Sequence, residues 1–308
     1  MEIVKDLRLA GQKFQGGSVT IGNFDGLHLG HQELLRRAKA LGGPVVVITF
    51  DPHPVQVLYP EKQLRRLFPR EDLYEQLPRY GADLLWMLPF SKEFAAWPAE
   101  QFLEDCLWKP LRPKSLVAGY DFAFGKSRGG SLDGLKAWGQ NKGVGVHVVE
   151  PQMVGHEVVS SRRVRELVMQ GRAREAAALL GRPFYLRGPV VSGAGRGAGL
   201  GFPTLNQQVV NETCPANGVY ASFTRFADKK YSSITNIGVN PTFGGGQIKV
   251  ETHVFDSNLD LRGITIDVDL VDYIRPEMKF ASVEDLKIQI RQDILKANET
   301  LDIRRRIK

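Results

Sequence analysis

The first half of the chain alternates short apolar runs with segments of helical periodicity. The apolar runs have the length and the β-branched content of buried strands, and they lie at 19–24, 44–50, 82–88, 115–119 and 144–150. Apolar residues recur at helical spacing in six further segments, at 31–41, 71–81, 93–108, 131–143, 160–171 and 174–181. Strands that alternate with helices form a parallel sheet, which binds ligands at the carboxyl ends of its strands. We therefore expect an α/β domain over residues 1–182.

The periodicity changes after Gly181-Arg182-Pro183. Five segments of alternating polar and apolar residues follow, separated by Gly, Asn and Asp, at 184–193, 218–226, 230–238, 248–256 and 264–274. Short alternating strands of this kind are typical of a small antiparallel β-barrel. A helical pattern over about 283–297 comes last. Because glycine ends helices and proline cannot continue them, we place the boundary at 182/183 and a barrel domain over 183–308.

Composition and charge narrow the class of protein. The 308 residues carry a net charge of +7, without the interleaved basic and aromatic residues that suit RNA. No apolar run approaches the ~20 residues of a membrane span. The two cysteines, Cys106 and Cys214, have no metal-ligand spacing. We expect a cytoplasmic protein that binds neither nucleic acid nor membrane, and the charge is compatible with nucleotide substrates; self-association is left open.

The turn between the first apolar run and its helix carries two histidines. Glycines at 22, 26 and 30 free the backbone, and His28 and His31 lie where the helix begins. The N–H groups and the dipole of a helix start bind anions. Two imidazoles there predict a site for a phosphate on which charge develops, the alternative being a tight turn with surface histidines.

A second glycine-rich segment, SGAGRGAGLGFPTLN, begins the barrel half. Its glycines precede Thr204 and Asn206, whose side chains face one side of an extended segment. Oxygen ligands of this type suit Mg²⁺ held together with phosphate oxygens. A dinucleotide-binding fingerprint lacks its following helix here, and Gly125-Lys126-Ser127 does not complete a P-loop because residue 120 is tyrosine.

Several motifs resemble those of one enzyme family. GNFDGLHLGH resembles the HxGH signature of the nucleotidyltransferase superfamily, in the form found in bacterial bifunctional riboflavin kinase/FAD synthetases. Further segments resemble the same family, namely TFDPHP, AGYDFAFGKSRGG, VVSSRRVRE, GFPTLN and VETH. The chain departs from the family at Arg162, where threonine is usual, and at Leu205, where alanine is usual. The resemblance implies a Rossmann-like nucleotidyltransferase domain followed by a barrel-shaped riboflavin kinase domain.

The resemblance also implies the residues that bind substrates and those that act in catalysis. Catalytic roles fall on His28, His31 and Glu251, the last as general base of the kinase. The implied ATP- and phosphate-binding residues are Gly22, Phe24, Asp25, Gly30, Ser160, Ser161, Arg165, Gly193, Gly195, Gly197 and Gly201. Those implied to bind flavin in the first domain are Phe50, Pro52, His53, Pro54, Asp121 and Phe124. Thr204 and Asn206 would hold Mg²⁺.

The implied function is bifunctional. ATP would phosphorylate riboflavin to FMN and ADP in the barrel, and a second ATP would adenylylate FMN to FAD and pyrophosphate in the first domain, both with Mg²⁺. Two alternatives stay open: another HxGH nucleotidyltransferase, or a non-enzymatic regulator that binds nucleotide or RNA. An aminoacyl-tRNA synthetase is disfavoured, since the chain is short and lacks a KMSKS-like segment.

Overall fold

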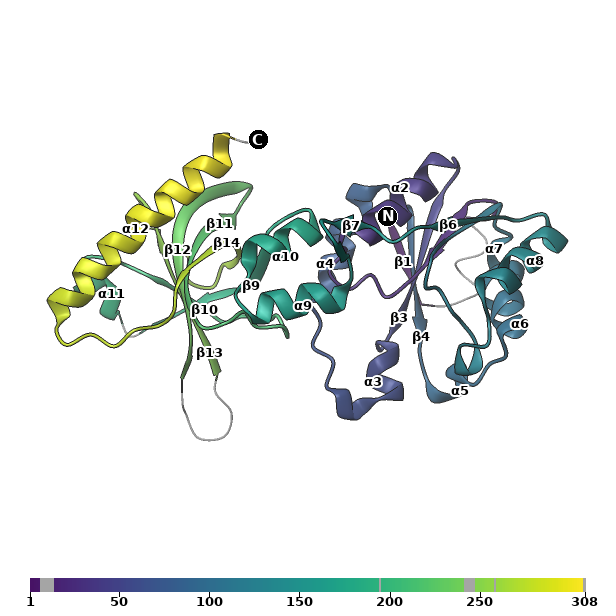
Figure 1. Cartoon of the computed structure of the whole chain (residues 1–308), viewed down its shortest axis with the longest axis horizontal. Coiled ribbons are helices and arrows are strands. Elements are labelled where there is room, and N and C mark those ends of the chain that lie inside the picture. The colour runs from purple at the N-terminus through teal and green to yellow at the C-terminus, as the bar shows by residue number, and fades with distance from the viewer. Residues whose placement is uncertain (6–13, 194, 241–246, 258, 307–308) are drawn as a thin grey trace. The chain divides into compact units, whose positions relative to one another are not determined.

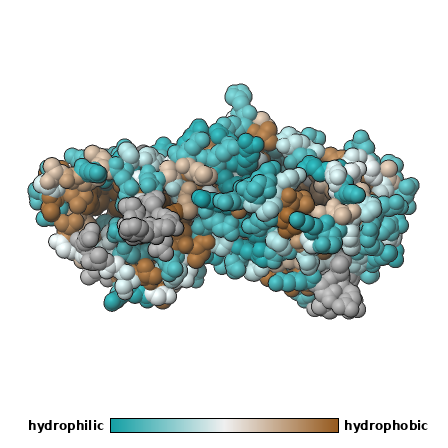
Figure 2. Space-filling view, turned by 90° about the horizontal axis from the view of Figure 1, so that it is seen from below, coloured by the Kyte–Doolittle hydropathy of each residue, from teal (hydrophilic) through white to brown (hydrophobic). Residues whose placement is uncertain are grey.

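The computed structural model describes residues 1–5, 14–193, 195–240, 247–257 and 259–306. The chain folds into two compact units, residues 1–160 and 161–308 (Figure 1). The first contains a six-stranded parallel sheet and the second a closed six-stranded barrel, which confirms the predicted fold class. Among the described residues no helix is long and apolar enough to cross a membrane. On the face shown in Figure 2, hydrophobic residues are scattered among hydrophilic ones.

The sheet of the first unit has the order β1-β4-β3-β2-β5-β6. Its strands are β1 (Glu2–Val4), β2 (Ser18–Ile21), β3 (Val45–Asp51), β4 (Leu84–Pro89), β5 (Ser115–Gly119) and β6 (Gly145–Val149). A two-stranded hairpin, β7 (Met153–Val154) with β8 (Glu157–Val158), stands apart from this sheet. The short strand β1 and this hairpin are elements that the sequence pattern did not predict.

Helices and short helical turns connect these strands. They are α2 (Leu29–Ala40), α3 (Pro54–Leu58), η1 (Pro60–Lys62), α4 (Glu71–Gln76), η2 (Leu77–Tyr80), α5 (Lys92–Ala95), α6 (Ala99–Phe102), η3 (Leu103–Trp108), α7 (Lys109–Leu111), η4 (Lys126–Arg128) and α8 (Leu132–Lys142). The helical segment predicted over 93–108 is divided into shorter helices, because Pro98 has no N–H to donate and α6 starts only after it.

The strand β3 shows why the sheet forms. Val46 and Ile48 pack into one hydrophobic cluster, and Val45 and Val47 pack into another. All four are fully buried. Because side chains alternate between the two faces of a strand, an uninterrupted apolar run is buried on both sides, as in parallel sheets covered by helices.

The barrel of the second unit has the cyclic order β10-β13-β12-β11-β14-β9 and is antiparallel throughout. Its strands are β9 (Phe184–Val191), β10 (Leu205–Gln207), β11 (Gly218–Phe226), β12 (Lys229–Asn240), β13 (Gln247–Val254) and β14 (Thr265–Arg275). The helices of this unit are α9 (Ser161–Met169), α10 (Ala173–Leu180), α11 (Arg196–Gly199) and α12 (Val283–Arg306). The final helix is thus longer than the predicted 283–297.

Buried hydroxyl groups form part of the barrel interior. Ser222 Oγ lies 2.8 Å from Ser233 Oγ and 2.8 Å from Thr235 Oγ1, and Thr235 Oγ1 lies 2.9 Å from Thr252 Oγ1. All four side chains are fully buried. These mutual hydrogen bonds satisfy polar groups that would otherwise destabilise the interior.

The helices α9 and α10 belong to the barrel unit. Arg174 Nη2 lies 2.6 Å from Asp272 Oδ2 on β14, and Ala216 N donates to Val168 O. These contacts explain why the first compact unit ends at residue 160 rather than at the Gly-Arg-Pro sequence. The 182/183 boundary for independently folding pieces stays a prediction.

Candidate functional site

The histidine turn lies where the strand order of the parallel sheet changes direction. From β2 the chain proceeds through β3 to β4 on one side, and then crosses to β5 and β6 on the other. The turn connects β2 to α2 at the carboxyl end of β2. In open α/β sheets, ligands bind in the crevice at such a switch point.

The backbone of this turn is strained and is held by buried side chains. Phe24 has φ +51° and Leu27 has φ +43°, both in the left-handed region. Each costs of order 1–3 kcal/mol, and such strain persists only where the surroundings enforce it. Phe24 and Leu27 are buried in the same hydrophobic cluster as Leu35 of α2. Packing therefore fixes the turn, and the Phe24 side chain, predicted near ATP, is part of the core.

The two histidines are stacked at the N-terminus of α2. Their ring centroids are 3.7 Å apart with an interplanar angle of 17°. His28 is the N-cap, and its Nδ1 accepts a hydrogen bond from the His31 backbone N–H at 3.4 Å. A Cβ atom on Gly30 would lie 3.1 Å from His28 Cε1. The absence of a side chain at Gly30 therefore leaves space for the imidazole ring of His28. The structure thus brings His28, Gly30 and His31 together as predicted.

His31 is neutral at physiological pH. Burial, and secondarily the charge of His28, hold the pKa of His31 well below its usual value of 6.5. Its Nδ1 is buried and has no hydrogen-bond partner among the residues that the structure describes. A neutral imidazole at a helix start can donate one N–H to a phosphate oxygen.

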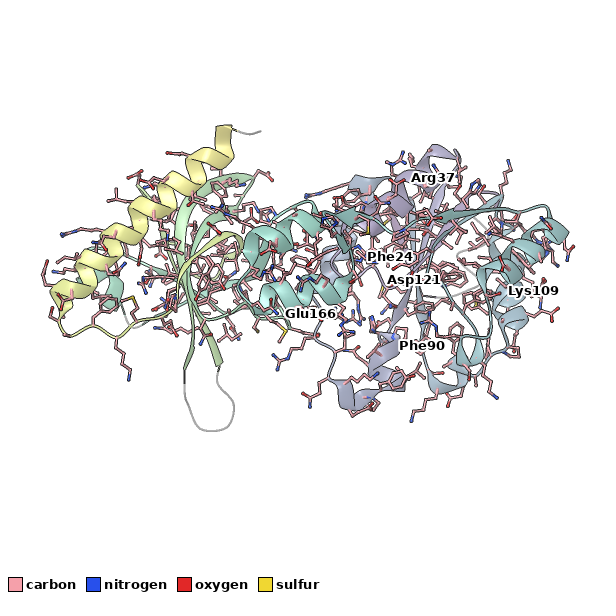
Figure 3. All side chains as sticks on the ribbon, in the orientation of Figure 1. Phe24, Arg37, Phe90, Lys109, Asp121 and Glu166 are labelled. Atoms are coloured by element: carbon pink, nitrogen blue, oxygen red, sulfur yellow. The ribbon has the colours of Figure 1, made fainter. Side chains whose placement is uncertain are left out.

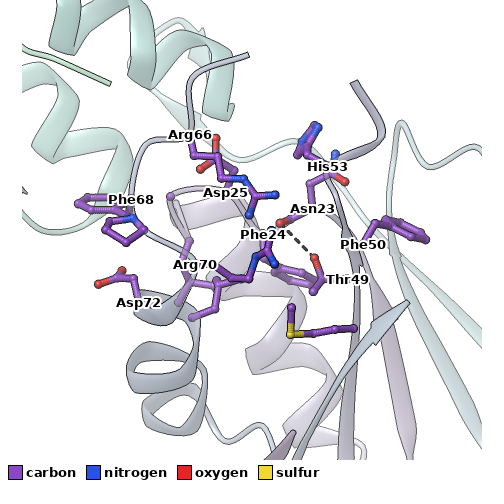
Figure 4. A pocket seen from close by; sticks show the side chains of 15 residues that line it. Asn23, Phe24, Asp25, Thr49, Phe50, His53, Arg66, Phe68, Arg70 and Asp72 are labelled. Carbon is purple, nitrogen blue, oxygen red and sulfur yellow. Dashed lines mark hydrogen bonds between the residues drawn. The ribbon is translucent and has the colours of Figure 1, made fainter. Parts of the chain in front are cut away.

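A solvent-open cleft of about 500 Å³ adjoins the turn (Figure 4). Residues after β2 form one wall, the end of β3 together with His53 forms a second, and residues before and within the first turn of α4 form a third. Arg66 and Arg70 come from this third wall, and their guanidinium groups point toward Asn23 and Asp25. The cleft therefore places two guanidinium groups, one of them paired with Asp51, beside the turn that leads into α2.

Two side chains hold this third wall in position. Asp25 Oδ1 accepts a hydrogen bond from the Leu67 backbone N–H at 3.0 Å, and Arg70 forms an ion pair with Asp51. Asp25, predicted to contact ATP, thus joins the histidine turn to the arginine segment. Sequence reasoning missed Arg66 and Arg70, although the basic cluster LRRLFPR was a visible signal.

Aromatic rings connect the predicted flavin residues along the same edge of the sheet. Phe50 lies 6.3 Å from Phe94, Phe94 lies 6.1 Å from Phe102, and Phe102 lies 5.6 Å from Phe124. Phe122 stacks on Phe124 at 5.3 Å and 23°. Phe50 and Phe124, 74 positions apart, thus belong to one aromatic cluster. Phe124 itself is buried, so its partly exposed neighbour Phe122 is the more accessible ring.

The segment after β3 uses its histidine as a helix cap. His53 Nδ1 accepts a hydrogen bond from Val55 N at 3.1 Å, and Gln56 Oε1 accepts one from His53 N at 3.3 Å. Pro52 joins Asp51 through a cis peptide bond, and Pro54 is the first residue of α3. The imidazole still lines the cleft, so capping fixes the orientation of the ring there.

The remaining predicted residues of the first half occupy different places. Asp121 is exposed and lies just after β5 (Figure 3). Gly22 follows β2, and a Cβ there would lie 3.4 Å from the Phe24 ring. Ser160 ends the first unit, whereas Ser161 and Arg165 belong to α9 in the second unit. A phosphate contact that unites these three residues with the histidine turn stays a prediction.

The predicted kinase residues form a strip on the outer side of the barrel. Val250, Thr252 and Val254 of β13 are buried, whereas the Glu251 side chain between them is 27% exposed. The register places Asn206 of β10 and Asn236 of β12 directly across from Glu251 on either side. Three strands therefore bring Asn206, Glu251 and Asn236 into one row. Sequence reasoning missed Asn236, because only the register reveals it.

The glycine-rich segment covers this strip. A Cβ on Gly193 would lie 2.5 Å from Asn206 Cγ, and one on Gly197 would lie 3.0 Å from Thr204 Oγ1. A side chain at Gly193 would collide with Asn206, and one at Gly197 would collide with Phe202 O at 2.5 Å and press against Thr204. Gly195 has φ +68° and Gly201 has φ +88°. Glycine is favoured at these two positions because the backbone is left-handed, a conformation that residues with a side chain rarely adopt.

The surroundings of the strip include an ion pair, a histidine and a small hollow of mixed polarity. Lys249 Nζ lies 2.8 Å from Glu251 Oε1. His253 donates from Nδ1 to Pro203 O at 2.8 Å. A hollow of about 270 Å³ adjoins Thr204 and is walled by Pro203, Thr204, Leu205, Val254, Ser257 and Leu259.

The oxygen atoms of the strip fit Mg²⁺ only if phosphate oxygens supply further ligands. Thr204 offers a hydroxyl and Asn206 an amide oxygen, which are hard ligands of the kind Mg²⁺ accepts. Among the described residues, no three His, Cys, Asp or Glu side chains cluster as a metal site. Mg²⁺ commonly keeps water and phosphate oxygens as its other ligands.

Comparison with known proteins gives a consistent result over the whole chain. The FAD synthetase family model matches residues 11–163, and the riboflavin kinase family model matches residues 180–301. The protein of Escherichia coli (strain K12) named bifunctional riboflavin kinase/FMN adenylyltransferase is 36% identical over 305 residues, covering 97% of each chain. The protein of the same name from Haemophilus influenzae is 33% identical over 299 residues, covering 96% of this chain and 97% of the other.

A solved structure covers both units. The crystal structure of a Streptococcus pneumoniae protein described as a macrolide-efflux protein superposes with a TM-score of 0.89 at 33% identity. It covers 96% of this chain and 98% of its own. The fold described above is therefore also found in an experimental structure.

Proposed function

This chain belongs to the family of bifunctional riboflavin kinase/FMN adenylyltransferases, and we propose that it makes FMN at its barrel and FAD at its parallel sheet. The observation that carries the proposal is the presence of two separate clusters of polar side chains, one in each unit, to which we assign phosphate binding. One is the stacked His28/His31 pair at a helix start, and the other is the Asn206–Glu251–Asn236 row beneath a glycine-rich cover.

In the first unit, His28 and His31 stabilise charge during adenylyl transfer. An oxygen of the FMN phosphate attacks the α-phosphorus of ATP, and pyrophosphate leaves with the electron pair of the broken P–O bond. The imidazole N–H groups and the N–H groups of α2 donate to phosphate oxygens. Arg66 and Arg70 supply positive charge for the phosphates in the adjoining cleft. The aromatic cluster that includes Phe50 and Phe122 offers flat apolar surface to the flavin ring.

In the second unit, Glu251 acts as general base. It accepts the proton of the primary hydroxyl of riboflavin while that oxygen attacks the γ-phosphorus of ATP. Positioned general bases contribute about 10²–10⁴-fold to such rates. The glycine-rich segment, closely packed on Thr204 and Asn206, covers the phosphates. Its glycines let the backbone approach phosphate oxygens closely.

Both reactions use ATP, and we infer that both need Mg²⁺. Thr204 and Asn206 would hold it in the kinase site, where Mg²⁺ neutralises charge on the phosphates when bound. The work of the chain itself is to orient these two oxygens toward one side and to cover them with glycines. We also infer a cytoplasmic location, since both cysteines are free thiols.

We propose further that the barrel functions without the first domain. The contacts of α10 with β14 support a fragment 161–308 that is more stable than the predicted fragment 183–308. Both fragments should phosphorylate riboflavin, and urea unfolding should show the higher midpoint for 161–308. A molten 161–308 fragment by circular dichroism would contradict the independence of the barrel.

Incubation of the full chain with riboflavin, ATP and Mg²⁺, followed by chromatography of the flavins, tests the function. We expect FMN first and FAD afterwards, and FAD alone when FMN is supplied. Another HxGH nucleotidyltransferase would leave riboflavin unchanged, and so would a regulator without enzymatic activity. Removal of Mg²⁺ with a chelator should stop both steps.

A further inference from the structure

The ion pair between Lys249 and Glu251 has no role in the mechanism described so far. The two residues are two positions apart on β13, so their side chains leave the same side of the strand. Lys249 Nζ lies 2.8 Å from Glu251 Oε1, and the side chains are 42% and 27% exposed. An ion pair this exposed contributes only about 0–1 kcal/mol to stability.

The position opposite Lys249 leaves room for its side chain. The register pairs Lys249 with Gly238 of β12, which has no side chain. The Glu277 carboxylate lies over Gly238, since a Cβ there would be 3.1 Å from Glu277 Cδ. Lys249 is therefore bordered by the carboxylate of Glu251 on its own strand and, over Gly238 of the neighbouring strand, by the carboxylate of Glu277.

Distances in the proposed kinase step place the phosphoryl group near this ammonium. A hydroxyl that donates to Glu251 lies about 2.7 Å from the carboxylate oxygen. The phosphorus that it attacks lies about 3–3.5 Å further on. An ammonium group already 2.8 Å from the same carboxylate, on a flexible four-carbon stem, can reach a phosphoryl oxygen by rotation of its side chain.

We propose that Lys249 is a catalytic residue of the kinase reaction and that its ammonium contacts an oxygen of the transferring γ-phosphoryl group. The inference rests on the proposed kinase function. The riboflavin hydroxyl oxygen forms the new bond to phosphorus, and its proton moves to Glu251. The bond between the γ-phosphorus and the bridging oxygen breaks, and ADP leaves with that electron pair. Lys249 keeps its three protons and moves from Glu251 toward the phosphoryl oxygens, which frees the carboxylate to accept the proton.

Three substitutions in the full chain test this role. Lys249→Met removes the charge and keeps most of the length, and we expect kcat for FMN formation to fall about 10- to 10²-fold with little change in KM for riboflavin. Lys249→Arg keeps the charge and should restore most of the rate. Lys287→Met is the matched control, since Lys287 pairs with Glu284 at 3.7 Å on α12 and should retain the parent rate.

Adenylylation of added FMN separates the possible failures. All three variants should form FAD from added FMN at the parent rate, and circular dichroism should match the parent spectrum. A Lys249→Met variant that phosphorylates riboflavin at the parent kcat would overturn the role of Lys249 and leave the proposed function intact. A Lys249→Arg variant as slow as Lys249→Met would also overturn it, because the charge would then not be what matters. A parent chain that makes FAD from FMN but no FMN from riboflavin would overturn the proposed kinase function itself.

Discussion

Replacement of the stacked histidines tests the adenylylation site more sharply than any other change. The rings of His28 and His31 are 3.7 Å apart and nearly parallel, and the His28 ring also accepts from the His31 backbone N–H. Loss of one donor to developing charge costs about 10²–10³-fold in rate, or roughly 2.7–4 kcal/mol. We expect His28→Ala and His31→Ala each to slow FAD formation by this factor.

The double replacement should be strongly non-additive. Each imidazole ring packs against the other. Removal of one ring therefore leaves space in which the remaining ring can move. Residues that act as a unit show such behaviour, with coupling energies of about 0.5–3 kcal/mol. The double variant should therefore lose less activity than the product of the two single losses predicts.

The assay is the initial rate of FAD formation from FMN, ATP and Mg²⁺, followed by chromatography. Riboflavin phosphorylation by the same samples is the internal control and should keep the parent rate. His156→Ala is the matched control, because His156 is an exposed histidine of the same unit, in the β7–β8 turn. Losses in the double variant equal to the product of the two single losses would refute the argument from stacking. Equal loss of FMN formation would refute the assignment of two sites.

Burial of His31 adds a dependence on pH to the same prediction. The pKa of His31 is lowered in the folded chain, whereas the unfolded chain binds its proton near pH 6.5. The unfolded state then binds more protons than the folded state between the lowered pKa and 6.5, so stability falls as pH falls through this window. His31→Ala should lose less stability than the parent between pH 7 and pH 5, as measured by urea unfolding at each pH. An identical pH dependence in the two proteins would argue against a neutral buried His31.

Further outcomes concern the barrel. Glu251→Gln should slow FMN formation by about 10²–10⁴-fold and leave adenylylation of added FMN intact; a parent rate by the same chromatographic assay would remove Glu251 as the base. Gly193→Ala should slow FMN formation about 10²-fold, because its Cβ would collide with the Asn206 side chain, which is proposed to hold Mg²⁺. Gly199→Ala meets no atom within 4 Å and should stay near the parent rate; similar losses in both would show that loop flexibility matters instead. Asp293→Asn should destabilise the barrel by about 3 kcal/mol in urea unfolding, since it leaves Arg275 facing a neutral partner at 2.7–3.0 Å in a place where Asp293 is 3% exposed.

Periodicity alone predicted the two-part architecture. The runs at 44–50 and 82–88 are apolar on both faces, and each became a central strand between two hydrophobic clusters. The segments at 218–226 and 264–274 became the long barrel strands β11 and β14, which are buried on both faces over most of their length because α12 packs against part of their outer side. Long elements with a regular pattern of apolar residues can be predicted from their own sequence, and the fold class depends mainly on such elements.

Short elements escaped prediction, because their stability comes from partners. β1 has three residues and exists by pairing with β4, which no local pattern records. The helix over 93–108 was drawn as continuous although Pro98 divides it. The end of α12 at Arg306 was predicted nine residues too early. In each case the interaction that decides the outcome lies outside the local pattern of apolar residues.

The site residues divide in the same way. His28, Gly30 and His31 share one turn, so their sequence spacing already places them together. Asn236 and Arg66 come from other parts of the chain, and only the register of β12 or the tether between Asp25 and Leu67 brings them to their sites. Sequence motifs identify residues that act locally, whereas residues contributed by distant strands need the structure.

The chemistry of the two nucleophiles explains why the two sites differ. The phosphate of FMN loses its second proton with a pKa near 6, so it is already an anion at neutral pH. It needs stabilisation of charge and no base, and a neutral His31 beside a helix start fits that need. The primary hydroxyl of riboflavin keeps its proton at neutral pH, and a carboxylate such as Glu251 must accept it during the attack. In the proposed mechanism, Lys249 beside that carboxylate would contact the transferring phosphoryl group. The proposed roles therefore place imidazoles where the nucleophile is already an anion, and a carboxylate with an ammonium group where the nucleophile still carries a proton.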